Sequence, residues 1–236
     1  MLPEQFLNRM KQMLGDEFPA FLESYEQDKY QALRINPQKT TISSFMEKSP
    51  FSLKQVPWEK NGFYYQKTDA PGKHPYHAAG VYYIQEPSAM APAAYLEAQP
   101  GERVLDLCAA PGGKSTQIAA AMGGEGLLIS NEIHPARAKI LSENIERMGI
   151  RNGMVINESP QSLAKIFESY FDRIMVDAPC SGEGMFRKNT DACEEWSPEN
   201  VENCAMRQQE ILICAAFMLR PGGRIVYSTC TFAPEE

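Results

Sequence analysis

The chain lacks several features that would assign it to whole classes of protein. Its 236 residues contain only three histidines, no C-x-x-C pair and no histidine beside a cysteine. Structural zinc sites need such clusters, and small secreted domains need a denser cysteine framework, so neither class is expected. The six cysteines are therefore predicted to be free thiols in a reducing compartment.

Long apolar runs are also missing. No stretch approaches the roughly 20 apolar residues of a membrane helix. The opening MLPEQ contains neither the basic nor the apolar region of a secretory signal. We expect a cytoplasmic protein that does not enter a membrane, and further expect a monomer without a metal ion.

Positive charge is not in excess, because the net charge is −7. This argues against a polybasic nucleic-acid binder, but the charge is unevenly divided. Residues 29–77 carry eight Lys or Arg against three acids, which leaves about −12 for the remainder. Tyrosines lie among these basic residues and would suit stacking and phosphate contact on RNA, although core packing explains most tyrosines of this kind.

The apolar pattern divides the chain near residue 80. Residues 3–30 predict helices that are interrupted at Gly15. Four apolar residues of the first helix share a face: Phe6, Met10, Met13 and Leu14. The part that follows is rich in proline and aromatics, with strand-like segments at 33–36 and 62–65. We expect residues 1–80 to form a smaller α+β region that binds the substrate.

From residue 101, predicted strands and helices alternate. The predicted strands are residues 104–107, 127–130, 154–156, 173–176 and 224–229. The predicted helices are residues 114–122, 135–148 with Gly149 as C-cap, and 198–219 with Ser197 as N-cap; a turn at 221–223 follows. Five strands alternating with helices indicate a parallel, doubly wound α/β sheet. Residues 81–236 are the predicted domain of this fold.

The turn after the first of these strands, DLCAAPGGKS (residues 106–115), is the most specific stretch. Its small residues let a ligand approach the backbone, and the helix that follows presents free N–H groups. It is not a P-loop, because Cys108 stands at the first glycine position, and G-x-G-x-x-G is absent. Glu132, just past the second strand, is placed to accept both hydroxyls of a ribose. S-adenosylmethionine, a nucleoside with an amino-acid tail, meets these requirements.

Together with DAPCSGEG (177–184) and YSTCT (227–231), this turn resembles the Nop/Sun family of RNA cytosine-5 methyltransferases. RIN (34–36) and YIQEPS (83–88) are also similar to that family, so the resemblance covers most of the chain. The segment EGMFRK (183–188) leans toward the bacterial branch that modifies small-subunit ribosomal RNA. The resemblance implies a Rossmann-like methyltransferase fold, S-adenosylmethionine as cofactor and RNA as partner.

The resemblance also implies roles for three side chains, and the chemistry suggests a fourth. Carbon 5 of cytosine is a poor nucleophile, so a thiolate must first add at carbon 6. By resemblance this nucleophile is Cys230, Cys180 helps the product to leave, and Asp177 faces ring nitrogen 3. Lys114 is a candidate for lowering the pKa of the Cys230 thiol.

For the cofactor, the resemblance marks the loop and three further positions. The expected cofactor residues are Ala109, Ala110, Pro111, Gly112, Gly113, Lys114, Ser115, Glu132, Arg137 and Asp177. Many relatives place an Asp after the third strand to hold the adenine amine. This chain has Asn157 there, which is the candidate for that contact.

Two other interpretations stay open beside ribosomal RNA methylation. One is a non-catalytic fragment that binds the cofactor and docks on RNA, and the other is transfer RNA as the substrate. An amino-group methyltransferase is less consistent, because residues 177–180 lack the Pro-Pro-aromatic platform. The sequence reaches only six residues beyond Cys230. We therefore expect domain 81–236 to be truncated after its fifth strand, with an exposed sheet edge that lowers stability or contacts another chain.

Overall fold

The computed structural model describes residues 2–188 and 191–236, which form two compact units. Unit 1 consists of Met1–Lys29, Ala178–Ile211 and Ser228–Glu236, and unit 2 of Tyr30–Asp177 and Leu212–Tyr227. Within the described part of the chain, no helix is long and apolar enough to cross a membrane. The division near residue 80 that the sequence indicates stays a prediction.

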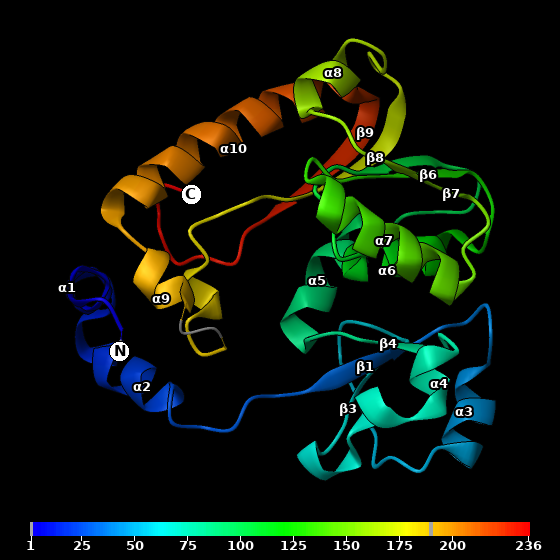
Figure 1. Cartoon of the computed structure of the whole chain (residues 1–236), viewed down its shortest axis with the longest axis horizontal. Coiled ribbons are helices and arrows are strands. Elements are labelled where there is room, and N and C mark those ends of the chain that lie inside the picture. Colours follow the sequence, from blue (N-terminus) through cyan, green and yellow to red (C-terminus); the bar gives the residue numbers. More distant parts are fainter. Residues whose placement is uncertain (1, 189–190) are drawn as a thin grey trace. The chain divides into compact units, whose positions relative to one another are not determined.

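A five-stranded sheet with the order β7-β6-β5-β8-β9 forms the centre of unit 2 (Figure 1). Its strands are β5 (Arg103–Asp106), β6 (Leu127–Asn131), β7 (Gly153–Ile156), β8 (Phe171–Asp177) and β9 (Leu219–Ser228). The pairs β5–β6, β5–β8 and β6–β7 are parallel, with Val104 opposite both Leu128 and Arg173. The predicted parallel, Rossmann-like sheet is confirmed.

Helices cover both faces of this sheet. Figure 1 shows α5 (Pro87–Leu96), α6 (Gly113–Met122) and α7 (Pro135–Met148) on one side of it and α8 (Pro160–Ala164) on the other. The core between α5, α6 and the strands consists of small and aliphatic residues: Ala93, Leu96, Val104, Ile118, Met122, Leu128 and Met175. Strands buried on both faces read as continuous apolar runs, which is why the sequence pattern located them.

A second, antiparallel sheet of four strands also belongs to unit 2, with the order β2-β3-β1-β4. Its strands are β1 (Ala32–Ile35), β2 (Lys54–Gln55), β3 (Gly62–Tyr64) and β4 (Tyr82–Ile84). The helices α3 (Ile42–Lys48) and α4 (Pro75–Ala78) accompany it, and several of the predicted tyrosines pack here. Tyr82 is fully buried with Phe45 and Phe63, so core packing explains it better than RNA stacking.

Unit 1 is mainly helical. Its elements are α1 (Glu4–Leu14), a 3-10 turn η1 (Gly15–Glu17), α2 (Phe18–Ser24), η4 (Glu183–Met185), α9 (Asp191–Glu195) and the first part of α10 (Pro198–Met218). Phe6 and Met10 are buried as predicted. The Phe6 and Phe186 rings pack edge to face, with their centroids 5.0 Å apart. Met13 was predicted on the same face, but 47% of its surface is exposed; it lies one turn beyond the buried Met10, next to the last residue of α1.

The predicted helices and strands of residues 101–236 occur within a few residues of their expected bounds. Gly149 caps α7 with φ of 74°, as predicted. The strand β9 differs, because it begins at Leu219 rather than at Arg224, so the predicted turn at 221–223 lies within the strand bounds. The helix α5 was not predicted, since Pro92 in its interior breaks the helical pattern.

Arg34 of β1 connects the four-stranded sheet to α6. Its side chain is fully buried, and its guanidinium donates to Gln85 Oε1 at 3.1 Å. It also donates to the carbonyl oxygen of Gly113 at 3.1 Å and to Thr116 Oγ1 at 2.6 Å, both in the first turn of α6. Burial lowers the pKa of Arg34 to about 10, because a low-dielectric environment disfavours the charged form. The cost of burying this cation is offset only while these acceptors surround it.

Replacing Arg34 with Met should therefore destabilise the protein. The substitution leaves several buried acceptors without a donor, and we expect the free energy of unfolding to fall by roughly 2–4 kcal/mol. Equilibrium urea unfolding measures this difference. Arg151→Met, at an exposed position, is the matched control and should change little. Equal effects of the two substitutions would contradict an anchoring role for Arg34.

Candidate active site

The loop between β5 and α6 is held by both neighbouring strands. The Leu107 N–H donates to the Met175 carbonyl at 2.9 Å, and the Ala109 N–H donates to the Asn131 carbonyl at 2.8 Å. Gly112 adopts φ of 111°, a backbone conformation that favours glycine, directly before α6 begins at Gly113. The predicted cofactor loop, Ala109 to Ser115, is thus a fixed turn at the carboxyl end of the central strand.

Asp106, the last residue of β5, has an unusual environment. Its carboxyl is fully buried, and Ser115 Oγ donates to Oδ2 at 2.6 Å, whereas Oδ1 has no hydrogen-bond partner among the described residues. Burial raises the pKa of Asp106 to about 7, and the Ser115 hydrogen bond opposes this shift. Ser130, opposite Asp106 in the register, has a buried Oγ that is also without a described partner.

These unpartnered oxygens fit a cofactor with an amino-acid tail. A buried acceptor without a donor is costly, and a bound ammonium group would satisfy it. Asp106 is part of the sequence motif 106–115 but was not predicted to be a binding residue. The sequence feature that could have identified it is an acidic residue directly after two apolar residues at the end of a predicted strand.

Glu132 lies past the end of β6, as predicted, and is connected to the loop. Only 3% of its surface is exposed, and its Oε1 accepts the His134 N–H at 2.9 Å. Arg137 links it to the loop, because its Nη1 lies 3.4 Å from Glu132 Oε2 and its Nη2 donates to the Ala110 carbonyl at 2.9 Å. The structure therefore brings the predicted residues Glu132 and Arg137 together with the loop.

Two asparagines hold the ends of β6 and β7. Asn157 Nδ2 donates to the Glu132 carbonyl at 2.5 Å, so Asn157 lies against the predicted ribose acceptor. Asn131 was not predicted; its Nδ2 donates to the carbonyls of Leu107 and Glu158, each at 3.1 Å. A contact of Asn157 with adenine stays a prediction.

Lys114 and Asp177 form a close ion pair in unit 2. The Lys114 Nζ lies 2.7 Å from Asp177 Oδ2, and the Asp177 side chain is about two-fifths exposed. The sequence assigned Lys114 to the Cys230 thiol, and the structure gives it Asp177 as a partner. An effect of Lys114 on the pKa of the thiol stays a prediction.

Cys180 and Cys230 lie together in unit 1, 50 residues apart in the chain. Their Sγ atoms are 3.2 Å apart, and the Cys230 N–H points at Cys180 Sγ at 3.4 Å. The Cys180 pKa is raised, first by its hydrogen bond with the Cys230 side chain and then by burial. Cys180 therefore keeps its proton while Cys230 is beside it, which is suitable for a proton donor or carrier.

The cysteine of the cofactor loop is different. Burial raises the pKa of Cys108 to about 12, and the nearby Asp106 and Glu132 carboxylates add to this shift. A protonated, buried thiol is a weak nucleophile. Cys108 is therefore not a candidate nucleophile.

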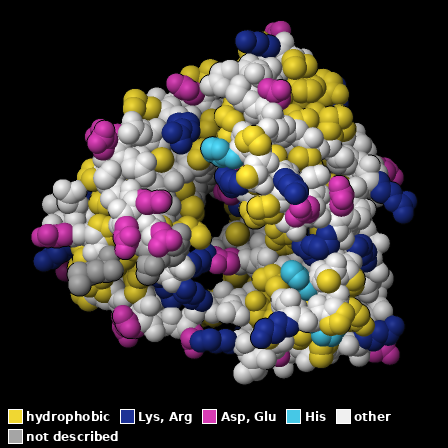
Figure 2. All heavy atoms as spheres, viewed as in Figure 1, with side chains coloured by type: hydrophobic (Ala, Val, Ile, Leu, Met, Phe, Trp, Pro, Cys, Tyr) yellow, Lys and Arg dark blue, Asp and Glu magenta, His cyan; other side chains and the backbone are white. Residues whose placement is uncertain are grey.

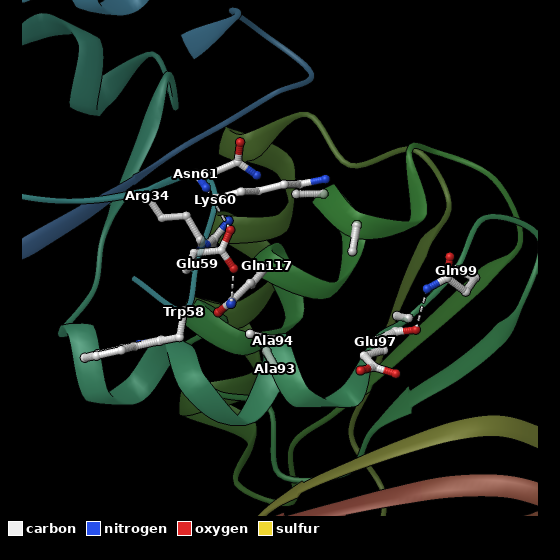
Figure 3. A pocket seen from close by; sticks show the side chains of 13 residues that line it. Arg34, Trp58, Glu59, Lys60, Asn61, Ala93, Ala94, Glu97, Gln99 and Gln117 are labelled. Carbon is white, nitrogen blue, oxygen red and sulfur yellow. Dashed lines mark hydrogen bonds between the residues drawn. The ribbon is translucent and has the colours of Figure 1, made fainter. Parts of the chain in front are cut away.

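A cavity of about 370 Å³ lies elsewhere in unit 2 (Figure 3). It is lined by Arg34, by residues 58–61 and by parts of α5 and α6. Figure 3 shows Gln117 pointing toward Glu59, to which its Nε2 donates at 2.5 Å. None of the predicted catalytic or cofactor residues lines this cavity.

Charged side chains do not separate into large patches on the face seen in Figure 2, where Lys and Arg alternate with Asp and Glu. Among residues 2–188 and 191–236, no group of three or more His, Cys, Asp or Glu side chains is arranged to hold a metal ion.

Comparison with known proteins agrees with this geometry. Residues 93–236 match the family described as 16S rRNA methyltransferase RsmB/F, and residues 2–87 match the N-terminal domain of 16S rRNA methyltransferase RsmF. Ribosomal RNA small subunit methyltransferase F of Escherichia fergusonii is 39% identical over 99% of this chain, which covers 51% of that protein. The chain thus spans about half the length of the curated relatives it matches.

Solved structures show the same fold. A methyltransferase homologue from Pyrococcus horikoshii is 30% identical with a TM-score of 0.86, over 99% of this chain and 75% of that one. The structure of PH0851 is 27% identical with a TM-score of 0.92, over 100% of this chain and 54% of that one. The chain belongs to the RsmB/F family of 16S rRNA methyltransferases, as its resemblance to the bacterial branch of the Nop/Sun family predicted.

Proposed function

We propose that this chain methylates carbon 5 of a cytosine in small-subunit ribosomal RNA, with S-adenosylmethionine as the methyl donor. The observation that supports this most strongly is the pair of thiols, Cys180 and Cys230, 3.2 Å apart. One thiol must attack the base and another group must assist its release, so two adjacent thiols suit this reaction. The relatives named as ribosomal RNA small subunit methyltransferases support the choice of substrate.

Cys230 is the proposed nucleophile. Its thiolate adds to carbon 6 of cytosine, which makes carbon 5 electron-rich enough to accept a methyl group. After methylation, carbon 5 carries both the methyl group and its original proton. Water accepts that proton, the electrons of the carbon–hydrogen bond restore the ring double bond, and the bond between sulfur and carbon 6 breaks, which frees Cys230 as a thiolate. Cys180 assists this release by donating a hydrogen bond to the departing sulfur, 3.2 Å away.

Asp177 and Lys114 are proposed to act at ring nitrogen 3. Negative charge develops on the ring when the thiolate adds, and a proton held at nitrogen 3 stabilises it. Asp177 would present that proton to nitrogen 3, and the Lys114 ammonium, 2.7 Å from Asp177 Oδ2, would hold the carboxyl group in place.

The loop 106–115 and its neighbours are proposed to hold S-adenosylmethionine, whose sulfonium supplies the methyl group. Asp106 Oδ1 would accept the amino group of the methionine part, because that oxygen is buried and lacks a described donor. Glu132 would accept the ribose hydroxyls, and Arg137 keeps Glu132 beside the loop. Asn157 is proposed to face the adenine.

Substitution of Cys230 tests the nucleophile. Cys230→Ser should lower methyl transfer to small-subunit ribosomal RNA by at least about 1000-fold, because a hydroxyl cannot replace the thiolate. Release of tritium from RNA labelled at cytosine carbon 5 measures the reaction at the predicted atom. Cys193→Ser, in α9, is the control and should retain activity.

Tritium release by Cys230→Ser at the wild-type rate would eliminate the mechanism. Transfer RNA, tested in the same assay, separates the two RNA substrates. Cofactor binding without transfer to any RNA would support the non-catalytic alternative.

Substitution of Cys180 tests the release step. Cys180→Ser should still form the bond between Cys230 and carbon 6 but break it slowly, so a covalent protein–RNA adduct accumulates. A denaturing gel with labelled RNA detects this adduct. The double variant Cys180→Ser with Cys230→Ser should form none. An adduct in the double variant would show that another residue attacks the base.

The raised pKa of Asp106 predicts how cofactor affinity depends on pH. With a pKa of about 7, the carboxyl is mostly protonated at pH 6 and mostly ionised at pH 8. An ammonium group binds the ionised form, so affinity for S-adenosylmethionine should rise about tenfold between these pH values. Titration calorimetry measures this. Asp106→Asn should bind weakly with little dependence on pH, and an unchanged slope in this variant would refute the assignment.

A further inference from the structure

One buried charged group has no part in the proposed chemistry. Glu183 opens the turn η4, three residues after Cys180, and its side chain is fully buried. Burying a carboxylate costs much free energy unless hydrogen-bond donors surround it. A buried acid at this position therefore needs an explanation from its partners.

Three donors from three different segments of unit 1 meet at this carboxylate. Glu183 Oε1 accepts hydrogen bonds from the Arg9 guanidinium of α1 and, at 2.9 Å, from Trp196 Nε1. Glu183 Oε2 accepts the backbone N–H of Phe232 at 3.0 Å. Both carboxylate oxygens are thus engaged, and one holds the segment that follows Cys230.

The residue after Glu183 holds the same segment from another point. The Gly184 N–H donates to the Cys230 carbonyl at 2.8 Å. A Cβ on Gly184 would lie 2.9 Å from that carbonyl oxygen, so the close approach needs glycine. Residues 183 and 184 therefore fix the backbone at positions 230 and 232, on both sides of Thr231.

Aromatic side chains keep the donors in place. The Arg9 guanidinium lies 5.6 Å from the Trp196 ring and 5.8 Å from the Phe6 ring. Cation–π contacts of this kind stabilise a guanidinium that is removed from water. Phe6 and Trp196 are themselves in the core of unit 1, so the Glu183 network is part of a rigid cluster.

We propose that Glu183 is a positioning residue for the Cys230 thiol. It connects the backbone after the nucleophile to α1 and to Trp196, and so sets where Cys230 Sγ lies beside Cys180. This inference rests on the proposed role of Cys230 as nucleophile. It adds that the acid of the segment 183–188 acts on the reaction through backbone geometry, without contacting the RNA or the cofactor.

Glu183→Gln is the first test. The amide has nearly the same shape, but its NH₂ group faces a donor whichever way it turns, so at least one of the three hydrogen bonds is lost. Because small displacements of a reacting group are costly, we expect kcat to fall about 10- to 100-fold, with KM for RNA and affinity for S-adenosylmethionine unchanged. Loss of a residue that only stabilised the fold would not lower kcat while leaving KM and cofactor affinity unchanged.

A second measurement does not depend on RNA methylation. Limited alkylation with iodoacetamide, followed by mass spectrometry of the Cys230 peptide, reports the reactivity of this thiol in the free protein. Glu183→Gln should change the rate of Cys230 alkylation and its dependence on pH, while alkylation of Cys193 stays constant. Glu202→Gln, an exposed acid on α10, is the matched control and should leave all quantities at wild-type values.

Trp196→Phe covers the case in which Glu183→Gln does not fold. It removes one hydrogen bond and keeps an aromatic ring in the cluster, and we expect a smaller fall in kcat, about 3- to 10-fold. Wild-type kcat and wild-type Cys230 alkylation in a folded variant at either position would overturn the proposal. If the wild-type protein methylates no RNA, the proposed function fails, and the alkylation rates still decide whether Glu183 positions Cys230.

Discussion

The pairing of β5 with β6 on one side and β8 on the other sets the positions of most candidate groups. Parallel strands in register end at the same edge of a sheet, so the groups that follow them are brought together. Asp106 ends β5, Glu132 follows β6 and Asp177 ends β8, although 71 residues separate the first from the last. The loop 106–115 can be a rigid turn because the carbonyls of Met175 and Asn131, in these same neighbouring strands, receive its N–H groups.

Three buried charged groups differ in how far hydrogen bonds offset the free energy of removing them from water. Arg34 and Glu183 are fully buried, and each is surrounded by hydrogen-bond partners from distant segments. Asp106 is equally buried, yet one of its oxygens has no partner within the described residues. A buried charged group whose hydrogen-bonding atoms all have partners in the chain stabilises the fold around it. A buried group with an unpaired oxygen can still accept a hydrogen bond from a ligand. This difference separates the anchoring residues from the candidate cofactor acceptor.

Local sequence patterns predicted much of this molecule for physical reasons. Buried parallel strands are continuous apolar runs, and α7 ends where Gly149 adopts a left-handed conformation, so both could be located from neighbouring residues. Glu132 could be predicted from its distance to the loop, and Arg137 from the resemblance to the Nop/Sun family. The burial of Arg34 and the bridging amide of Asn131 could not, because each depends on contacts with segments that are remote in the chain. The helix α5 was missed because Pro92 interrupts its local pattern.

The sequence by itself determined the fold class and the local form of the loop 106–115, and it indicated the residue types that are proposed for the reaction. These depend on local preferences: the periodicity of apolar residues, the conformational freedom of glycine and the chemistry of a thiol after a strand. Only the tertiary structure decided that Cys180 lies 3.2 Å from Cys230, that Lys114 pairs with Asp177 and that Glu183 holds the segment after Cys230. Such contacts arise when strands and helices far apart in the chain pack together, and no local pattern encodes which of them become neighbours.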